Sequence, residues 1–207
     1  KSVPDDKIIS PKQINVMIAS KNNGFGHAIY VQMPRMKQHV PLFVLFRALG
    51  INSDKEICSY ILLDCEKEQL EPLLFSLKAS IIDANKYLTQ EECFQQIVKH
   101  AMYTPINMTP EEGARKKEEF TRDILRKDLF PHCKTPTQRL YYLGYMVKSV
   151  IQCKLGIQPP DDRDNYRNKR LDLVGSLLNN LFRNYFNKLV KDMQKQIIRE
   201  INNGSWR

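Results

Sequence analysis

The chain has 207 residues, of which 42% are hydrophobic and 27% charged, the ordinary range of globular proteins. No stretch approaches the roughly 20 consecutive apolar residues of a membrane span, so the composition excludes a membrane protein. The length allows one domain with an appendage, or two small domains. Residues 1–10 contain neither an apolar signal core nor an initiator Met, which predicts a segment of a longer chain.

The net charge of +9 is unevenly distributed along the chain. Residues 51–112 carry 5 basic and 11 acidic side chains, whereas residues 1–50 carry 7 and 2, and residues 163–207 carry 10 and 4. An acidic face is repelled by phosphate, so this split predicts that only part of the surface faces a polyanion. From charge alone, solvated lysine-rich faces, which are common in soluble proteins, are the favoured interpretation.

Five cysteines are scattered along the chain without Cys-x-x-Cys spacing. An odd number in this arrangement predicts reduced core thiols in a reducing compartment and argues against a disulfide scaffold. They are Cys58, Cys65, Cys93, Cys133 and Cys153.

The first elements expected along the chain are a hairpin and a short helix. A turn-forming cluster at residues 22–26 precedes residues 27–33, where apolar and polar side chains alternate as in a half-buried strand. Residues 42–49 are strongly apolar and end before Gly50, which predicts a short buried helix. Within it, Arg47 is expected to pair with a buried carboxylate or to lie at the rim.

Five further segments have the capping residues and apolar spacing of helices. The first opens with Ser53-Asp54-Lys55-Glu56, which has the form of a capping box. These helices are expected at residues 53–64, 67–79, 89–102, 109–127 and 137–155. The sequence therefore predicts a mostly helical α+β fold with a small β element near residues 25–35.

The last third of the chain predicts one long amphipathic helix. Its apolar side chains recur at helical spacing over about 30 residues, a length of about 45 Å. So small a domain cannot cover such a helix fully, so we expect its apolar stripe to continue under protein beyond these 207 residues. The stripe comprises Leu171, Val174, Leu177, Leu178, Leu181, Phe182, Tyr185, Leu189, Met193, Ile197 and Ile201.

Opposite charges crowd together just before this helix. Asp161, Asp162 and Asp164 could hold Mg²⁺ and, with Lys169, build a small nuclease. The alternating signs favour instead a structural network of ion pairs that fixes a hinge loop. The network is predicted to comprise Asp161, Asp162, Arg163, Asp164 and Asp172, and the phosphate-facing residues to be Arg167, Lys169, Arg170, Lys188, Lys191 and Lys195.

No other motif points to catalysis or to a metal. The four histidines have no ligand spacing with one another or with the cysteines. Ser176 follows Gly175 but lacks the Gly-x-Ser-x-Gly frame of a nucleophile. We therefore predict no catalytic residue, no metal site and no cofactor within these residues.

A series of short sequence blocks runs through nearly the whole chain. The blocks are Lys37-Gln38-His39-Val40-Pro41, Phe46-Arg47-Ala48-Leu49-Gly50, Leu143-Gly144-Tyr145-Met146, the run from Asp161 to Leu173, Leu177-Leu178 and Leu181-Phe182-Arg183. In order and spacing they resemble the second-largest (β-type) subunits of multisubunit DNA-directed RNA polymerases from eukaryotes, archaea and large DNA viruses. One position departs from the pattern, because Arg167 stands where the family usually has glycine.

The resemblance implies the lobe and adjoining protrusion of that subunit, which form one side of the DNA cleft. Residues 1–35 would be a protrusion-side segment with the hairpin, residues 36–160 the helical lobe, and residues 161–207 a hinge loop and a helix returning to the protrusion. The implied partners are other polymerase subunits including the largest, duplex DNA near the downstream cleft and general transcription factors, with no membrane.

The resemblance also implies where the chemistry lies. The parent would be a nucleotidyltransferase whose Mg²⁺ and structural Zn²⁺ sites lie outside this segment. The implied location is intracellular: the nucleus, or the cytoplasm or virion for a viral source. A free-standing helical module that binds a groove of another protein is the alternative.

Overall fold

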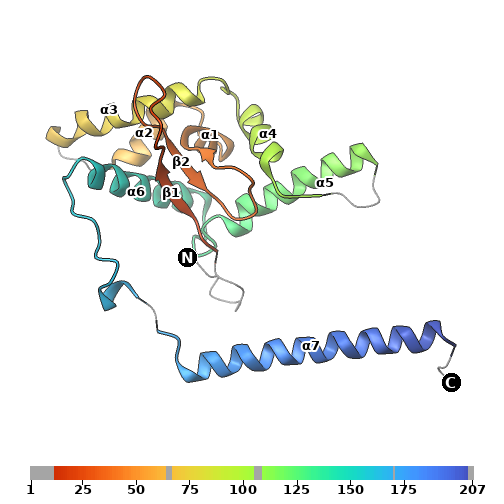
Figure 1. Cartoon of the computed structure of the whole chain (residues 1–207). Helices are drawn as coiled ribbons and strands as arrows, with labels where there is room; N and C mark the ends of the chain where they lie inside the picture. Colours follow the sequence, from red (N-terminus) through yellow and green to blue (C-terminus); the bar gives the residue numbers. More distant parts are fainter. Residues whose placement is uncertain (1–11, 64–66, 105–108, 170, 205–207) are drawn as a thin grey trace. The chain divides into compact units, whose positions relative to one another are not determined.

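A computed structural model describes residues 12–63, 67–104, 109–169 and 171–204 of the chain. It divides into two compact units, Lys1–Pro159 and Pro160–Arg207. Each unit is described below by itself. The predicted fold class is confirmed, because helices predominate beside one small antiparallel sheet (Figure 1).

The sheet of the first unit contains strands β1 (Asn15–Ile18), β2 (Ile29–Gln32) and β3 (Val40–Pro41), in the order β1-β2-β3. The predicted hairpin is formed by β1 and β2, with Val16 opposite Val31. In its turn, the side-chain oxygen of Asn22 accepts hydrogen bonds from the backbone N–H groups of Gly24 and Gly26. Both glycines have positive φ angles, which glycine adopts without steric penalty.

The described residues of this unit form six α-helices and one π-helical turn, of which α1, α3 and α6 contact the sheet (Figure 1). Every residue of α1 is buried, so this short helix lies at the centre of the core. No helix among the described residues is long and apolar enough to cross a membrane. The elements are α1 (Leu42–Ala48), α2 (Asp54–Leu62), α3 (Lys67–Ala84), α4 (Gln90–His100), α5 (Pro110–Asp123), the π-helix (Ile124–Asp128) and α6 (Pro136–Lys154).

Capping boxes begin three of these helices. Thr89, Thr109 and Thr135 each accept a hydrogen bond from the backbone N–H three residues on, and the residue at that position bonds back to the cap. The capping box expected at Ser53 is wrong, because the Ser53 side chain makes no capping hydrogen bond. The extent of α3 also differs, since it continues to Ala84 with Pro72 inside its second turn.

Helices α2 and α6 approach each other closely at Gly144. A Cβ atom built on Gly144 would overlap the backbone carbonyl of Tyr60, with the carbonyl carbon only 2.7 Å away, and would lie 3.3 Å from the Cα atom of Ile61. Real Cβ atoms do not approach backbone atoms so closely. Glycine at this position therefore sets the distance between the two helices.

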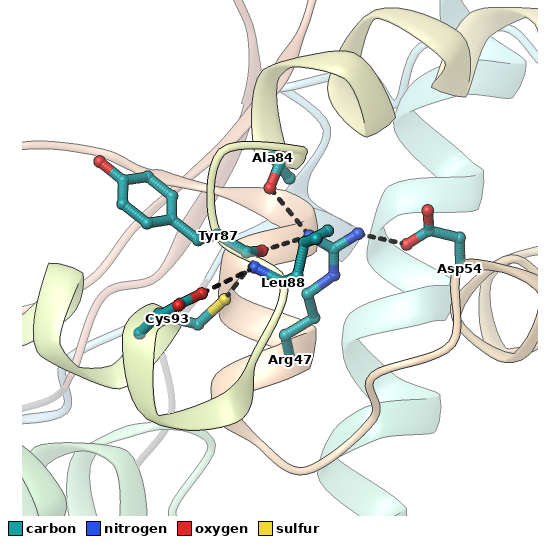
Figure 2. A network of polar contacts seen from close by, with 7 residues as sticks. Arg47, Asp54, Ala84, Tyr87, Leu88 and Cys93 are labelled. Atoms are coloured by element: carbon teal, nitrogen blue, oxygen red, sulfur yellow. Dashed lines mark hydrogen bonds and ion pairs between the residues drawn. The ribbon is translucent and has the colours of Figure 1, made fainter.

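Arg47 pairs with a carboxylate as predicted, but that carboxylate, Asp54, is 38% exposed, and backbone carbonyls supply further partners (Figure 2). The Arg47 side chain is only 2% exposed, and its Nη2 atom lies 2.6 Å from a carboxylate oxygen of Asp54. Its Nη1 atom donates hydrogen bonds to the backbone carbonyls of Ala84 and Tyr87. One guanidinium thus joins α1 to the start of α2, the end of α3 and the loop before α4.

The cysteines described by the structure are free thiols. Cys58, Cys93 and Cys133 are buried, and burial raises the pKa of each thiol, so they stay protonated at neutral pH. Cys153 is half-buried. The expectation of reduced core thiols is met at the three buried positions, and Cys65 lies outside the described residues.

Candidate nucleic-acid interface

The charged loop of the second unit is held mainly by hydrogen bonds to backbone groups. A carboxylate oxygen of Asp162 accepts from the N–H of Asp164 at 2.9 Å, and the carbonyl of Asp162 accepts from the Asn168 side chain at 2.7 Å. Asn165 caps a 3-10 turn at Tyr166–Asn168 by accepting from the N–H of Arg167 at 3.0 Å. These bonds fold residues 162–168 into a compact local turn.

Sequence reasoning missed the two asparagines of this turn. Asn165 and Asn168 carry no charge, so they did not stand out among the ionic side chains around them. The available signal was the tendency of Asp and Asn to accept hydrogen bonds from backbone two residues on. Arg167 lies in the 3-10 turn and is not among the residues with positive φ, so its position does not require glycine.

An ion pair in the described part of the loop joins Asp164 of the predicted network to Lys169, which was predicted to face phosphate. The Nζ atom of Lys169 lies 3.4 Å from a carboxylate oxygen of Asp164. Both side chains are solvent-accessible, at 47% and 90%, so this pair contributes at most about 1 kcal/mol. The structure gives no ion pair for Asp161, Arg163, Arg167 or Asp172 among the described residues, and Arg170 lies outside them.

The three neighbouring aspartates do not form a metal-binding cluster in the described residues. No group of three or more His, Cys, Asp or Glu side chains there is arranged to hold an ion. Asp162 is oriented toward the backbone N–H of Asp164, and Asp164 toward Lys169. A divalent ion would have to displace both interactions to gather these carboxylates.

The long helix predicted at the end of the chain is present as α7 (Val174–Asn202), 29 residues or roughly 43 Å. Lys188, Lys191 and Lys195 fall within a sector of about 60° around its axis, because each residue advances about 100°. Met193 and Ile197 lie on the opposite side. All three lysines are exposed, so they form one continuous basic stripe.

The apolar stripe of α7 winds around the helix. Six apolar residues recur at every fourth position, and each such step advances about 40° beyond a full turn. The stripe therefore rotates by about 200° between its first and last members. None of the described α7 residues is buried, and the six positions are Leu181, Tyr185, Leu189, Met193, Ile197 and Ile201.

A helical unit followed by a helix with an exposed apolar stripe is the architecture of a component of a larger assembly. The family model described as RNA polymerase Rpb2, domain 2, matches residues 9–172. The RNA polymerase II subunit RPB2 of Encephalitozoon cuniculi is 37% identical over 99% of this chain. Subunit 2 of RNA polymerase II from Arabidopsis thaliana is 34% identical over 90% of the chain, and subunit Rpo2N of Methanococcus vannielii is 34% identical over 82%.

The chain therefore belongs to the family of second-largest subunits of DNA-directed RNA polymerases, as domain 2, a structural lobe part of that subunit. This confirms the family inferred from the sequence blocks, and the alternative of a free-standing helical module is not favoured. The chain spans 17%, 15% and 33% of the lengths of the three relatives named above.

Proposed function

We propose that this chain forms one wall of the DNA cleft of a DNA-directed RNA polymerase and carries no catalytic centre of its own. The observation that supports this most directly is the basic stripe of Lys188, Lys191 and Lys195, which is exposed and spaced along one side of α7. Regularly spaced lysines contact phosphates without reading bases. Arg167, Lys169 and Arg170 in the preceding loop would extend this contact.

The loop at residues 161–172 would act as a hinge between the lobe and the protrusion, with α7 returning to the protrusion. Two findings support this division. The family model ends at residue 172, just before α7 begins, and the compact first unit ends at Pro159. The winding apolar stripe of α7 also requires cover on different sides along its length, which more than one segment of the parent subunit would supply.

The parent enzyme would be a nucleotidyltransferase, because the relatives are named as subunits of DNA-directed RNA polymerase. Its Mg²⁺ and structural Zn²⁺ would be bound outside these residues. Its partners would be the other polymerase subunits, including the largest, duplex DNA and general transcription factors. It would work inside the cell, in the nucleus of a eukaryote.

The role of the α7 stripe in DNA contact is tested by salt titration. The chain should bind duplex DNA weakly, with log K falling steeply as log salt rises. Changing Lys188, Lys191 and Lys195 together to glutamine should reduce the magnitude of this slope by up to about three, about 0.9 for each lost phosphate contact. Fluorescence anisotropy with a labelled duplex at several salt concentrations measures the slope.

A matched variant separates the stripe from the general effect of charge. Arg115, Lys116 and Lys134 are exposed basic residues of the first unit, and changing all three to glutamine removes the same charge. This control should leave the slope nearly unchanged. Equal slopes for the two triple variants would contradict a DNA contact through α7.

The proposed lack of a catalytic centre in this chain is tested with nucleic acid and Mg²⁺. The chain alone should neither cleave duplex or single-stranded DNA nor incorporate nucleotides when Mg²⁺ is added. Gel electrophoresis of end-labelled substrates measures both reactions. Cleavage that requires Mg²⁺ and disappears in Asp162→Ala would instead favour the small nuclease built on the loop aspartates.

A further inference from the structure

A hollow of about 520 Å³ opens on the first unit where α1, α4, the end of α5, the π-helix and α6 meet. Its apolar lining includes Leu49, Phe94 and Leu125. Three arginines also line it: Arg122, Arg126 and Arg139. Volumes of this order hold small ligands or a few side chains of a bound peptide.

Arg139 enters this hollow from the first turns of α6. Its Nη1 atom donates to the carbonyl of Leu125 at 3.3 Å, which fixes the guanidinium against the π-helix. Its Nε atom is buried and has no hydrogen-bond partner among the described residues. Buried donors without partners are rare in folded proteins, so the groups around Arg139 do not fully neutralise its guanidinium.

Arg122 and Arg126 also line the hollow, and both are exposed. The guanidinium carbon of Arg122 lies 5.1 Å from the ring centroid of Phe94, and its Nη2 atom lies 4.0 Å from Glu118, a distance at the limit of an ion pair. Arg126 has no hydrogen-bond or ion-pair partner in the part of the chain that the structure describes. The charges of Arg122 and Arg126 are therefore incompletely neutralised by the described residues.

The π-helical turn explains why these side chains meet. In this turn the N–H of Leu129 bonds the carbonyl of Ile124, five residues back. The wider turn places Leu125 and Arg126 in the lining of the hollow, and the Leu125 carbonyl accepts from Arg139. Single π turns inside α-helical stretches are uncommon and are frequent at functional sites.

Carboxylates at the rim limit which anion fits. Glu91 lines the hollow, and the side-chain amide of Gln95 donates to both Glu91, at 2.9 Å, and Glu118, at 2.8 Å. A nucleic-acid backbone would bring further phosphates against these acids and the acidic first turn of α4. A short peptide can place one carboxylate among the arginines and an apolar side chain against Phe94 and Leu125.

From this arrangement we propose that the hollow is a docking site for an acidic segment of a partner protein. The segment presents an Asp or Glu side chain to Arg126 and Arg139, and a neighbouring apolar side chain contacts Phe94 and Leu125. Arginine forks bind carboxylates through two parallel hydrogen bonds, and the apolar floor adds burial that a free anion lacks. This inference rests on the geometry of the first unit and is independent of the role proposed for α7.

The site is tested with blocked hexapeptides in which Asp or Glu alternates with Leu, Ile, Met, Phe or Trp. Members of this library should bind the 207-residue chain saturably, and Arg126→Gln should weaken the best binder about tenfold, the loss expected for one charge-assisted hydrogen bond. Arg126 is exposed and makes no hydrogen bond or ion pair with the described residues, so this variant should keep the native thermal midpoint. Fluorescence anisotropy measures binding, and circular dichroism measures the midpoint.

Matched probes and a matched variant decide between the possible results. The library with Asn and Gln in place of the acids should not bind, and Arg115→Gln, an equal charge loss on α5 and outside the lining of the hollow, should leave the affinity unchanged. The proposal is overturned if no acidic peptide binds, or if the amide library binds equally well. It is also overturned if duplex DNA or inorganic phosphate displaces the peptide and loses affinity with Arg126→Gln to the same degree.

Discussion

Replacing Gly144 by alanine should destabilise the first unit strongly. The added methyl group would overlap the carbonyl of Tyr60, and that atom belongs to the backbone of α2, so no side-chain rotation can relieve the overlap. Helix α2 would have to move, and Ile57 and Ile61, both fully buried, would lose contacts with α6. We expect a loss of at least about 3 kcal/mol, at the upper end of what overpacking a core usually costs.

The expected loss is opposed by a smaller gain. Alanine is about 1 kcal/mol better than glycine inside a helix, so the net effect would be reversed only if the clash were mild. Urea unfolding followed by circular dichroism measures the difference, and a loss of 3 kcal/mol corresponds to a fall of roughly 6 to 12 °C in thermal midpoint for a chain of this size.

Gly175→Ala is the matched control for this prediction. Gly175 also lies in a helix, but an added Cβ there has no atom of the described residues within 4 Å. This variant should leave the midpoint of the first unit unchanged and should not reduce helix content. A similar loss in both variants would show that the α2–α6 approach is not the cause.

The sequence predicted the helices well because their ends carry local signals. One signal is Thr109 and Pro110 with the two glutamates that follow, which begin α5 through hydrogen bonds within a few residues. Another is Gly156, whose positive φ angle ends the preceding apolar helix. The hairpin turn at Asn22 is equally local. The start of α6 was expected one residue late, because Thr135 was not recognised as its cap.

Other features could not be derived from local patterns. Strand β3 has only two residues, one of them a proline, and it forms because β2 already offers a free edge. The π-helix, Ile124–Asp128, replaces the last turn of a stretch that reads as one continuous helix from residue 109 to residue 127. The residue pattern that predicts a helix there does not distinguish this turn from an α-helical one.

The basic stripe of α7 and the arginine hollow of the first unit also differ in how far local sequence patterns predict them. The charge and spacing of Lys188, Lys191 and Lys195 are visible in the sequence, because one helix places them on one side. The arginine hollow is not visible, because Arg139 is separated by 13 residues from Arg126, and the two line one hollow only once Arg139 of α6 is bonded to Leu125 of the π-helix. Long-range packing decides which charges meet, and one sequence alone does not give it.

Replacing Arg47 by methionine should have the second large effect, for a reason that also depends on long-range contacts. The carbonyls of Ala84 and Tyr87 are 37 and 40 residues away, and both would lose their bond to the guanidinium. Each carbonyl keeps one further donor, the N–H of Tyr87 for Ala84 and the thiol of Cys93 for Tyr87, so the loss is that of two charge-assisted hydrogen bonds, each worth about 1.5 to 3 kcal/mol. With the loss of the Asp54 ion pair, we expect a total of about 3 to 5 kcal/mol, a large part of the stability of a typical domain.

Arg47→Lys should be nearly as destabilising, although it keeps the positive charge. A lysine ammonium is a compact group at the end of a flexible stem and does not reproduce the planar guanidinium fork that reaches Ala84, Tyr87 and Asp54 together. Asp54→Asn should cost less, because the Asp54 side chain is 38% exposed and the amide oxygen can still accept from Arg47.

Urea unfolding of these variants beside Arg115→Met provides the measurement and its reference. Arg115 is exposed, so its replacement should change the free energy of unfolding by no more than about 0.5 kcal/mol. If Arg47→Met also changed it by less than about 1 kcal/mol, the carbonyls would have found other donors, and Arg47 would not be what joins α1 to α2, α3 and α4. If Arg47→Lys kept nearly the native free energy of unfolding while Arg47→Met lost several kcal/mol, the positive charge alone would matter at this position.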